Sequence, residues 1–322
     1  MLTTNKSGTT VISPRKIVTP RSPEIRKADK ALALGHSLST EQARERFKDL
    51  ASAFVERDRG WVRFLIIGYG KSGKTHAVIH TAPTPILLMM FDPNSEQLVS
   101  PELVSKGLVL PVRYFGDDPE KPYLYRQWEK DVFTWKVDGF FSCFATVCID
   151  SLSQMMVSQL RQIAYDDTIG LGVTKKGERK SLMPQIQDYN VLKISTVTTL
   201  LALCTIDAHI VLNAHILEER NFRDMKDMIG FVQKRLNATP ALQANVPPLF
   251  SEVYIADSLI DKKTRKQEWF WQTTRSDKFP ELNIGSIISG EKKLVKEEEE
   301  QDYRKLLKKC GFHHEDKPPL SG

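Results

Sequence analysis

The sequence has few cysteines and no long apolar run. Its four cysteines, Cys143, Cys148, Cys204 and Cys310, include no C-x-x-C pair, and three of them lie in apolar segments. We therefore expect small, buried thiol side chains in a reducing compartment. No stretch of 18 apolar residues is present, and the N-terminal region lacks the apolar segment of a signal peptide. These absences predict a soluble, cytoplasmic protein without a membrane partner.

Basic charge is also scarce outside the N-terminal region. The formal net charge is +6, but residues 1–35 contain seven Lys and Arg against two Asp and Glu and so account for +5. A nucleic-acid-binding surface in the remainder would therefore be a local patch. Residues 1–35 are rich in Ser, Thr, Pro, Lys and Arg, which predicts a disordered basic tail. Contact of this tail with DNA is an open alternative to simple solvation.

Apolar, strand-like runs alternate with helical patterns along the rest of the chain. Strands are expected at 62–67, 86–91, 108–114, 144–149 and 209–213, and helices at 74–79, 122–136, 152–165 and 188–206. This alternation predicts one α/β domain over residues 36–285, with a mostly parallel sheet and helices on both faces. Ser39 and Gln42 have the spacing of a capping box and predict an additional helix before the first strand.

The pattern changes toward the C-terminus. Two β-prone runs, 252–259 and 267–274, flank a polar and mostly basic stretch and predict a β-hairpin. Residues 286–322 are expected to form a charged tail, with a solvated helix over 291–309 that stops at Gly311 and an acidic polar face at 297–300. His313 to Asp316 are metal-ligand residue types, but their sequence alone does not fix a coordination geometry.

Residues 68–75, Gly-Tyr-Gly-Lys-Ser-Gly-Lys-Thr, match the phosphate-binding pattern G-x-x-x-x-G-K-[ST] completely. The match follows the apolar run 62–67 and precedes a helical segment, which is the context that such a loop requires. Its glycines allow backbone N–H groups to approach phosphate oxygens at the positive end of the helix. A glycine-rich turn without a ligand is the alternative. The residues expected to bind the nucleotide are Gly68, Tyr69, Gly70, Lys71, Ser72, Gly73, Lys74, Thr75 and His76.

Three side chains in this pattern have distinct expected roles. Lys74 would reach the β- and γ-phosphates, and the Thr75 hydroxyl would hold Mg²⁺. Asp150 follows the strand at 144–149 and would complete the Mg²⁺ shell, with capping of the next helix as the alternative. Residue 151 is Ser, whereas helicases and AAA+ machines usually place a water-activating Glu directly after the metal-binding Asp.

Taken together, these segments resemble the RecA-like P-loop ATPases, of AAA type, that are encoded in phage recombination and replication modules. The resemblance covers roughly residues 60–280. It implies a RecA-like core, binding of ATP and Mg²⁺, ATP hydrolysis, and a homo-oligomer with nucleotide at its subunit interfaces. It also implies single-stranded DNA or a DNA-recombination protein as the partner, in the host-cell cytoplasm. The segments that carry it are Gly68 to Thr75, Phe91-Asp92, Ile149-Asp150-Ser151, Gln187-Asp188-Tyr189 and Val211 to His215.

The resemblance leaves the general base open. Related enzymes commonly carry a catalytic Glu two residues after an Asp at the end of the second strand, and here Asn94 occupies that position after Asp92. Glu96 and Asp92 are therefore both candidates, since Asn cannot accept a proton from water. His215 would sense the γ-phosphate, with a hydrogen-bonded residue at a strand end as the alternative.

Basic residues after the hairpin are candidates for contact with a neighbouring subunit's nucleotide. Arg275 and Lys278 lie in this segment, and Arg is favoured because its planar side chain can contact two phosphate oxygens. Exposed loop residues without this role are the alternative.

Two other functions remain open. A P-loop kinase of a nucleoside or metabolite would need a basic lid, for which the loop 173–180 is suitable. A nucleotide-binding assembly protein with little hydrolysis is compatible with Asn94.

Overall fold

The computed structural model describes residues 39–56, 60–169, 171, 183–221, 231–260, 265–280, 282–288 and 294–321. The chain divides into two units, Met1–Arg57 and Asp58–Gly322. The helix α2 (Thr40–Glu56) belongs to the first unit, which differs from the predicted boundary at residue 36. Its capping box is confirmed: Gln42 N–H donates to Ser39 Oγ at 3.2 Å, and Ser39 N–H donates to Gln42 Oε1 at 3.0 Å.

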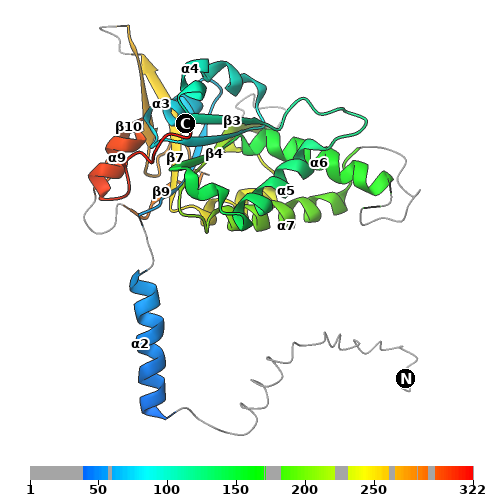
Figure 1. The fold of residues 1–322 in the computed structure, drawn as a ribbon. Coiled ribbons are helices and arrows are strands. Elements are labelled where there is room, and N and C mark those ends of the chain that lie inside the picture. Colours follow the sequence, from blue (N-terminus) through cyan, green and yellow to red (C-terminus); the bar gives the residue numbers. More distant parts are fainter. Residues whose placement is uncertain are drawn as a thin grey trace, which may run out of the picture. The chain divides into compact units, whose positions relative to one another are not determined.

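The second unit is built on a mixed, mostly parallel sheet of ten strands within the described residues (Figure 1). The parallel strands lie in the order β7, β1, β5, β4, β2, β3. Because these strands run in the same direction, their carboxyl ends meet along one edge of the sheet. The strands are β1 (Arg63–Gly68), β2 (Ile86–Met90), β3 (Val109–Arg113), β4 (Thr146–Asp150), β5 (His209–Asn221), β6 (Phe231–Leu236), β7 (Glu252–Ile260), β8 (Gln267–Gln272), β9 (Gly285–Ser286) and β10 (Glu298–Glu300).

Helices cover both faces of the sheet, as the alternating pattern predicts. Three helices lie side by side on one face (green in Figure 1), namely α5 (Leu124–Val137), α6 (Leu152–Thr168) and α7 (Ile186–Leu203). The other face carries α3 (Lys74–Thr81) and α9 (Tyr303–Cys310). Successive residues of β1 belong to the two apolar clusters in turn, so the strand is buried on both sides. The short elements are α4 (Pro101–Ser105), α8 (Pro240–Asn245), η1 (Pro93–Leu98), η2 (Phe140–Cys143) and η3 (Pro247–Leu249).

Antiparallel strands extend the sheet on one side. β7 and β8 form the predicted hairpin, whose turn at 261–264 lies outside the described residues. β5 continues past the parallel sheet and pairs with β6 from Ile216 onward. Of the cysteines, Cys148 and Cys204 are buried as expected, whereas Cys143 is exposed.

The prediction of a solvated helix in the C-terminal region is wrong. Residues 298–300 form β10, which pairs with β8, instead of a polar helix face. The helix is shorter than expected, and it buries Tyr303, Leu306 and Leu307 against the sheet. Its predicted stop is confirmed, because Gly311 ends the helix in the left-handed conformation. The alternating charges concealed an amphipathic helix whose apolar side chains are three and four residues apart.

Residues 313–321 then cross the amino ends of the parallel strands, and we call this segment the strap. Backbone N–H groups of the strap donate to carbonyl oxygens before three strands: His313 to Gly60, Lys317 to Thr84 and Leu320 to Gly107. The Lys317 ammonium group also donates to the Ser142, Phe144 and Asp207 carbonyl oxygens, at 2.6 to 3.1 Å. The strap therefore ties together segments that precede β1 to β5.

A buried histidine anchors the strap. The Val62 N–H donates to His209 Nδ1 at 3.0 Å, so the ring proton lies on Nε2, which donates to the His313 carbonyl at 2.8 Å. Burial lowers the pKa of His209 to about 4, and the charge of Lys317 adds to this shift, whereas the hydrogen bonds with His313 and Val62 oppose it. The neutral ring thus satisfies both partners.

We expect Gly107→Ala to destabilise the protein by more than a matched glycine substitution. Gly107 has φ of +65°, and an added Cβ would lie 2.2 Å from the Ser321 backbone nitrogen. Gly139 has φ of +79° and no atom within 4 Å of such a Cβ, so Gly139→Ala measures the backbone cost alone, about 1–2 kcal/mol. Gly107→Ala should cost about 1 kcal/mol more in urea unfolding. Equal losses, or a difference that persists after deletion of residues 319–322, would contradict the strap contact.

No helix in the described ranges is long and apolar enough to cross a membrane.

Candidate functional site

The predicted phosphate-binding loop connects β1 to α3 in the structure. β1 ends at Gly68, and α3 begins at Lys74 directly after Gly73, which has φ of +88°. This left-handed conformation explains the requirement for glycine at position 73, because residues with a Cβ rarely adopt it. The Ala77 N–H donates to the Gly73 carbonyl at 2.8 Å and closes the first helical turn. The loop N–H groups thus precede the positive end of a helix at the carboxyl edge of the sheet.

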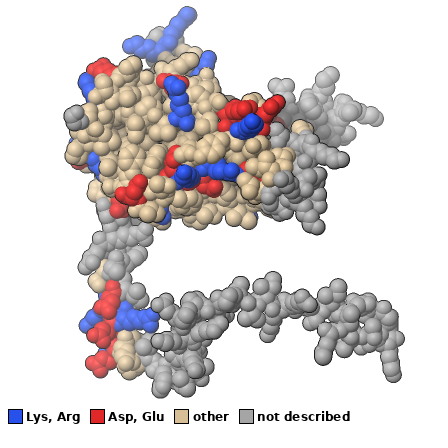
Figure 2. All heavy atoms as spheres, turned by 45° about the vertical axis from the view of Figure 1, so that its right-hand side comes forward, with Lys and Arg blue, Asp and Glu red and all other residues tan. Residues whose placement is uncertain are grey.

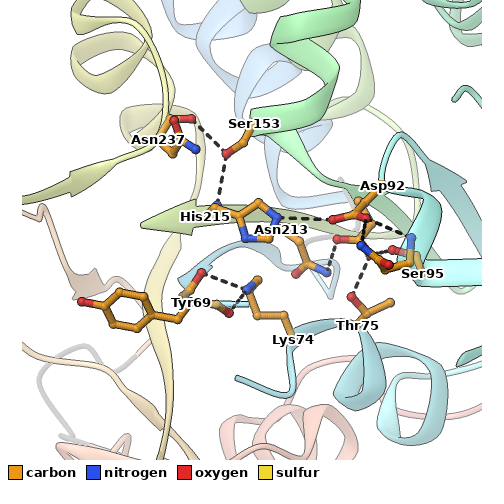
Figure 3. A network of polar contacts seen from close by, with 12 residues as sticks. Tyr69, Lys74, Thr75, Asp92, Ser95, Ser153, Asn213, His215 and Asn237 are labelled. Carbon is orange, nitrogen blue, oxygen red and sulfur yellow. Dashed lines mark hydrogen bonds and ion pairs between the residues drawn. The ribbon is translucent and has the colours of Figure 1, made fainter. Parts of the chain in front are cut away.

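The Lys74 side chain folds back onto its own loop (Figure 3). Its ammonium group donates to the Gly68 carbonyl at 2.9 Å and to the Tyr69 carbonyl at 2.7 Å. Lys74 is only 5% exposed, and burial lowers its pKa to about 8, although the charges of Asp150 and Asp92 oppose this shift. A buried ammonium group next to backbone N–H donors suits an anionic ligand.

Asp150 is at the centre of a buried network at the end of β4. Its Oδ2 accepts from the Thr75 hydroxyl at 2.7 Å and from the Ser95 hydroxyl, and its Oδ1 accepts from Asn213 Nδ2 at 3.2 Å. Asn213 is fully buried, and its Oδ1 has no hydrogen-bond partner among the described residues.

This set of oxygen atoms fits a hydrated Mg²⁺ ion. The Thr75 and Ser95 hydroxyls and the Asp150 carboxylate are the hard oxygen donors that Mg²⁺ selects, and the ion usually keeps several of its waters. The unpartnered Asn213 Oδ1 lies behind this donor set, since Asn213 donates to Asp150 but does not line the cleft. Asp150 does not cap α6, because the residue before that helix is Ser151 and makes no side-chain cap.

Asp92 and His215 face each other across the same region (Figure 3). Their Oδ2 and Nε2 atoms are 3.5 Å apart, and this interaction is the main reason why the pKa of Asp92 is lowered. Asp92 Oδ1 also accepts from the backbone N–H of Asn94 at 3.0 Å and from its side-chain amide at 3.1 Å. The Ser153 hydroxyl, which donates to the Asn237 carbonyl, accepts from the His215 N–H and so fixes the end of the parallel part of β5.

These side chains line one cleft of about 1180 Å³. Gly70 to Ala77 form one wall, together with Asp92, Ser95, Asp150 and His215. The hairpin and β10 also line the cleft beside the loop, through residues that include Trp269, which is 46% exposed, and Gln301. The cleft is large enough for a nucleotide, since it exceeds the usual range of about 300–1,000 Å³ for small-molecule sites.

Four predicted residues do not place their side chains in this cleft. Glu96 forms an ion pair with Arg113, and Tyr69 donates its hydroxyl to Glu218 while its carbonyl accepts from Lys74. Lys278 pairs with Asp257. Arg275 lines a separate small hollow with residues 273–274, 284–286 and 295.

Several cleft residues have little or no signal in the sequence. Ser95 has only a weak sequence signal, its position three residues after Asp92, because serine is common at the start of short helices. Gln301 and Trp269 follow no motif, and only the pairing of β10 with β8 brings Gln301 to the cleft.

No protein-family model matches the chain, and a search of curated proteins finds no significant sequence match.

Proposed function

We propose that the protein binds ATP with Mg²⁺ and hydrolyses it, as a RecA-like P-loop ATPase that acts in phage DNA recombination or replication. The observation that supports this most is the meeting of Lys74, Thr75, Asp150, Asp92 and His215 around one cleft at the carboxyl ends of β1, β4, β2 and β5. Open α/β sheets bind ligands at this edge.

The proposed roles follow from the positions of the side chains. Lys74 would leave the carbonyl oxygens of Gly68 and Tyr69 and contact the β- and γ-phosphates, with the loop N–H groups around it. Thr75 and Asp150 would hold Mg²⁺, which offsets the negative charge on the phosphates. His215 would sense the γ-phosphate. It belongs to β5 and contacts Asp92, so a change at the γ-phosphate would reach β5 through this side chain.

The proposed partner is single-stranded DNA or a recombination protein, bound by a homo-oligomer. On the face shown in Figure 2, Lys and Arg side chains are interspersed with Asp and Glu side chains. A nucleic-acid-binding surface on this face would therefore be a small basic patch. This agrees with the small net charge outside residues 1–35. The basic tail at 1–35 lies outside the described residues.

The proposal is tested by measuring MgATP binding and phosphate release with purified protein, with and without single-stranded DNA. We expect micromolar or tighter binding and slow basal hydrolysis that DNA stimulates. Absence of MgATP binding would refute the nucleotide-binding site, whereas binding with transfer of phosphate to a nucleoside would favour the kinase. The loop 173–180, on which the kinase alternative depends, lies outside the described residues.

A nucleotide-binding assembly protein with little hydrolysis is the second candidate. It is favoured by the absence of a glutamate at position 94 and by the positions of the two neighbouring acidic residues, Asp92 and Glu96. Asn94 donates to Asp92, while Glu96 turns away to Arg113. Only Asp92 of the two candidate bases lies in the cleft.

We therefore expect Asp92→Asn to slow ATP hydrolysis by roughly a hundredfold or more, the usual effect of losing a general base. Glu96→Gln should change the rate by less than about threefold, because it removes only an exposed ion pair. Single-turnover hydrolysis of both variants at saturating MgATP measures the chemical step. A loss in Glu96→Gln with normal turnover in Asp92→Asn would show that Glu96 reorients and is the base.

The burial of Lys74 predicts that nucleotide affinity decreases above pH 8. In the free protein the pKa of Lys74 is lowered to about 8, and phosphate oxygens would stabilise the protonated form and raise it. Below pH 8 the side chain is already charged, so affinity is nearly constant. Above pH 8 binding takes up a proton, and affinity falls by up to about tenfold per pH unit. Calorimetry at pH 7 and 9 in buffers of different ionisation heat measures both effects. Equal affinity without proton uptake would contradict this prediction.

A further inference from the structure

Gln301 connects the C-terminal region to the phosphate-binding loop. It follows β10, is 8% exposed, and lies against Ser72 and Gly73. Its Nε2 donates to the Ser72 carbonyl at 3.0 Å and to the Phe270 carbonyl at 3.0 Å, with the Asp257 carbonyl at 3.4 Å. One amide group thus joins the loop to β8 and β7.

The surrounding atoms determine the orientation of the Gln301 amide. Three carbonyl oxygens surround Nε2 of Gln301, and only an NH₂ group can donate to them. The Oε1 atom is buried without a hydrogen-bond partner among the described residues and lies against Gly73, where an added Cβ would be 2.5 Å away. Gln301 therefore fits closely over the backbone at residues 72 and 73.

Two of the three carboxylates on β10 are paired with lysines, whereas Glu298, which also lines the cleft, has no ion pair among the described residues. Glu299 and Glu300 line the cleft, but Lys309 pairs with Glu299 and Lys305 pairs with Glu300 at 2.9 Å. Both lysines belong to α9, which is packed on the sheet through buried apolar residues. α9 therefore supports β10 while reducing its repulsion of phosphate.

We propose that Gln301 is a positioning residue that holds the phosphate-binding loop in its ligand-ready conformation. The donated hydrogen bond fixes the Ser72 carbonyl on the outer side of the loop. The N–H groups of the following residues then remain directed to the phosphate position. Loss of the donor leaves the Ser72 and Phe270 carbonyls without this partner and releases the loop.

The test uses the full chain with the near-isosteric change Gln301→Glu, which replaces donors by a carboxylate. The matched control is Gln243→Glu, because the Gln243 amide also donates to two backbone carbonyls, those of Leu236 and Ala238 at 2.9 Å each. The first measurement is amide hydrogen exchange of Ser72 and Ala77 without nucleotide, because their N–H groups donate to the Tyr69 and Gly73 carbonyls within the loop. We expect about tenfold faster exchange in Gln301→Glu only, which corresponds to the loss of roughly one net hydrogen bond.

The second measurement is MgATP affinity by calorimetry, and it rests on the proposed function. Gln301→Glu should weaken binding by about tenfold or more, and Gln243→Glu by less than about threefold. If Gln301→Glu fails to unfold cooperatively, Gln301→Met, which adds no charge, is measured in the same way.

The outcomes separate the two proposals. Unchanged exchange at Ser72 and Ala77, or equal acceleration in Gln243→Glu, would overturn the positioning role. A lower melting temperature of Gln301→Glu with normal MgATP affinity would overturn it too, because the contact would then be structural only. If the wild-type protein binds no MgATP, the proposed function fails, and the exchange result still decides the role of Gln301.

Discussion

Replacement of Lys74 by alanine should weaken MgATP binding by at least about a hundredfold while the fold remains intact. The buried Lys74 ammonium group donates to two loop carbonyls, and it would exchange them for phosphate oxygens when the nucleotide binds. A charge-assisted hydrogen bond contributes roughly 1.5–3 kcal/mol. Two such bonds to phosphate oxygens account for the expected loss. Calorimetry measures the affinity, and urea unfolding without nucleotide checks the fold.

A second lysine in the same loop provides the control. Lys71 is exposed, so Lys71→Gln removes equal charge from the cleft wall without removing a buried donor. We expect a loss of less than about tenfold for this variant. Equal losses for both lysines would indicate general electrostatic attraction. Normal affinity of Lys74→Ala would refute the assignment of the phosphate-binding loop.

Asp150→Asn should abolish most Mg²⁺-dependent hydrolysis, with a loss of roughly a hundredfold or more, while ATP binding without Mg²⁺ changes little. Asn keeps the size of Asp150 and still accepts from the Thr75 hydroxyl, but it lacks the charge that holds a metal ion. Hydrolysis rates measured over a range of Mg²⁺ concentrations should show a higher Mg²⁺ requirement in the variant. Asp166→Asn, which removes an acidic group paired with Arg126, is the matched control. A wild-type rate in Asp150→Asn would leave Asp150 with a structural role only.

The sequence predicted those parts of the fold that local patterns encode. The parallel strands and their helices are apolar at regular intervals, and their ends carry the recognisable residues Gly68, Asp92, Asp150 and His215. Because parallel strands place their carboxyl ends on one edge, the convergence of these residues follows from the strand assignments. The loop, Thr75 and Asp150 were therefore predictable as one group.

Long-range contacts made by polar segments were not predictable. The run Glu298–Glu300 has the composition of a solvated surface, and only its pairing with β8 makes it a strand. Gln301 has no sequence signal because its partners are backbone carbonyls, which every residue possesses. The choice between Asp92 and Glu96 also needed the structure: Asp92 caps the short helix η1 and lines the cleft, whereas Glu96 within that helix pairs with Arg113.

The position of β1 between strands that come much later in the chain has a consequence for biosynthesis. Val62 meets His209 across 147 residues, Arg63 meets Ser251 across 188, and Ser72 meets Gln301 across 229. While residues 60–200 emerge from the ribosome, both edges of this apolar strand still lack their neighbours. Parallel pairing over such sequence separations is intrinsically slow, so we expect the unpaired strand to be exposed to aggregation during synthesis. The cleft can form only after residue 301 has been synthesised.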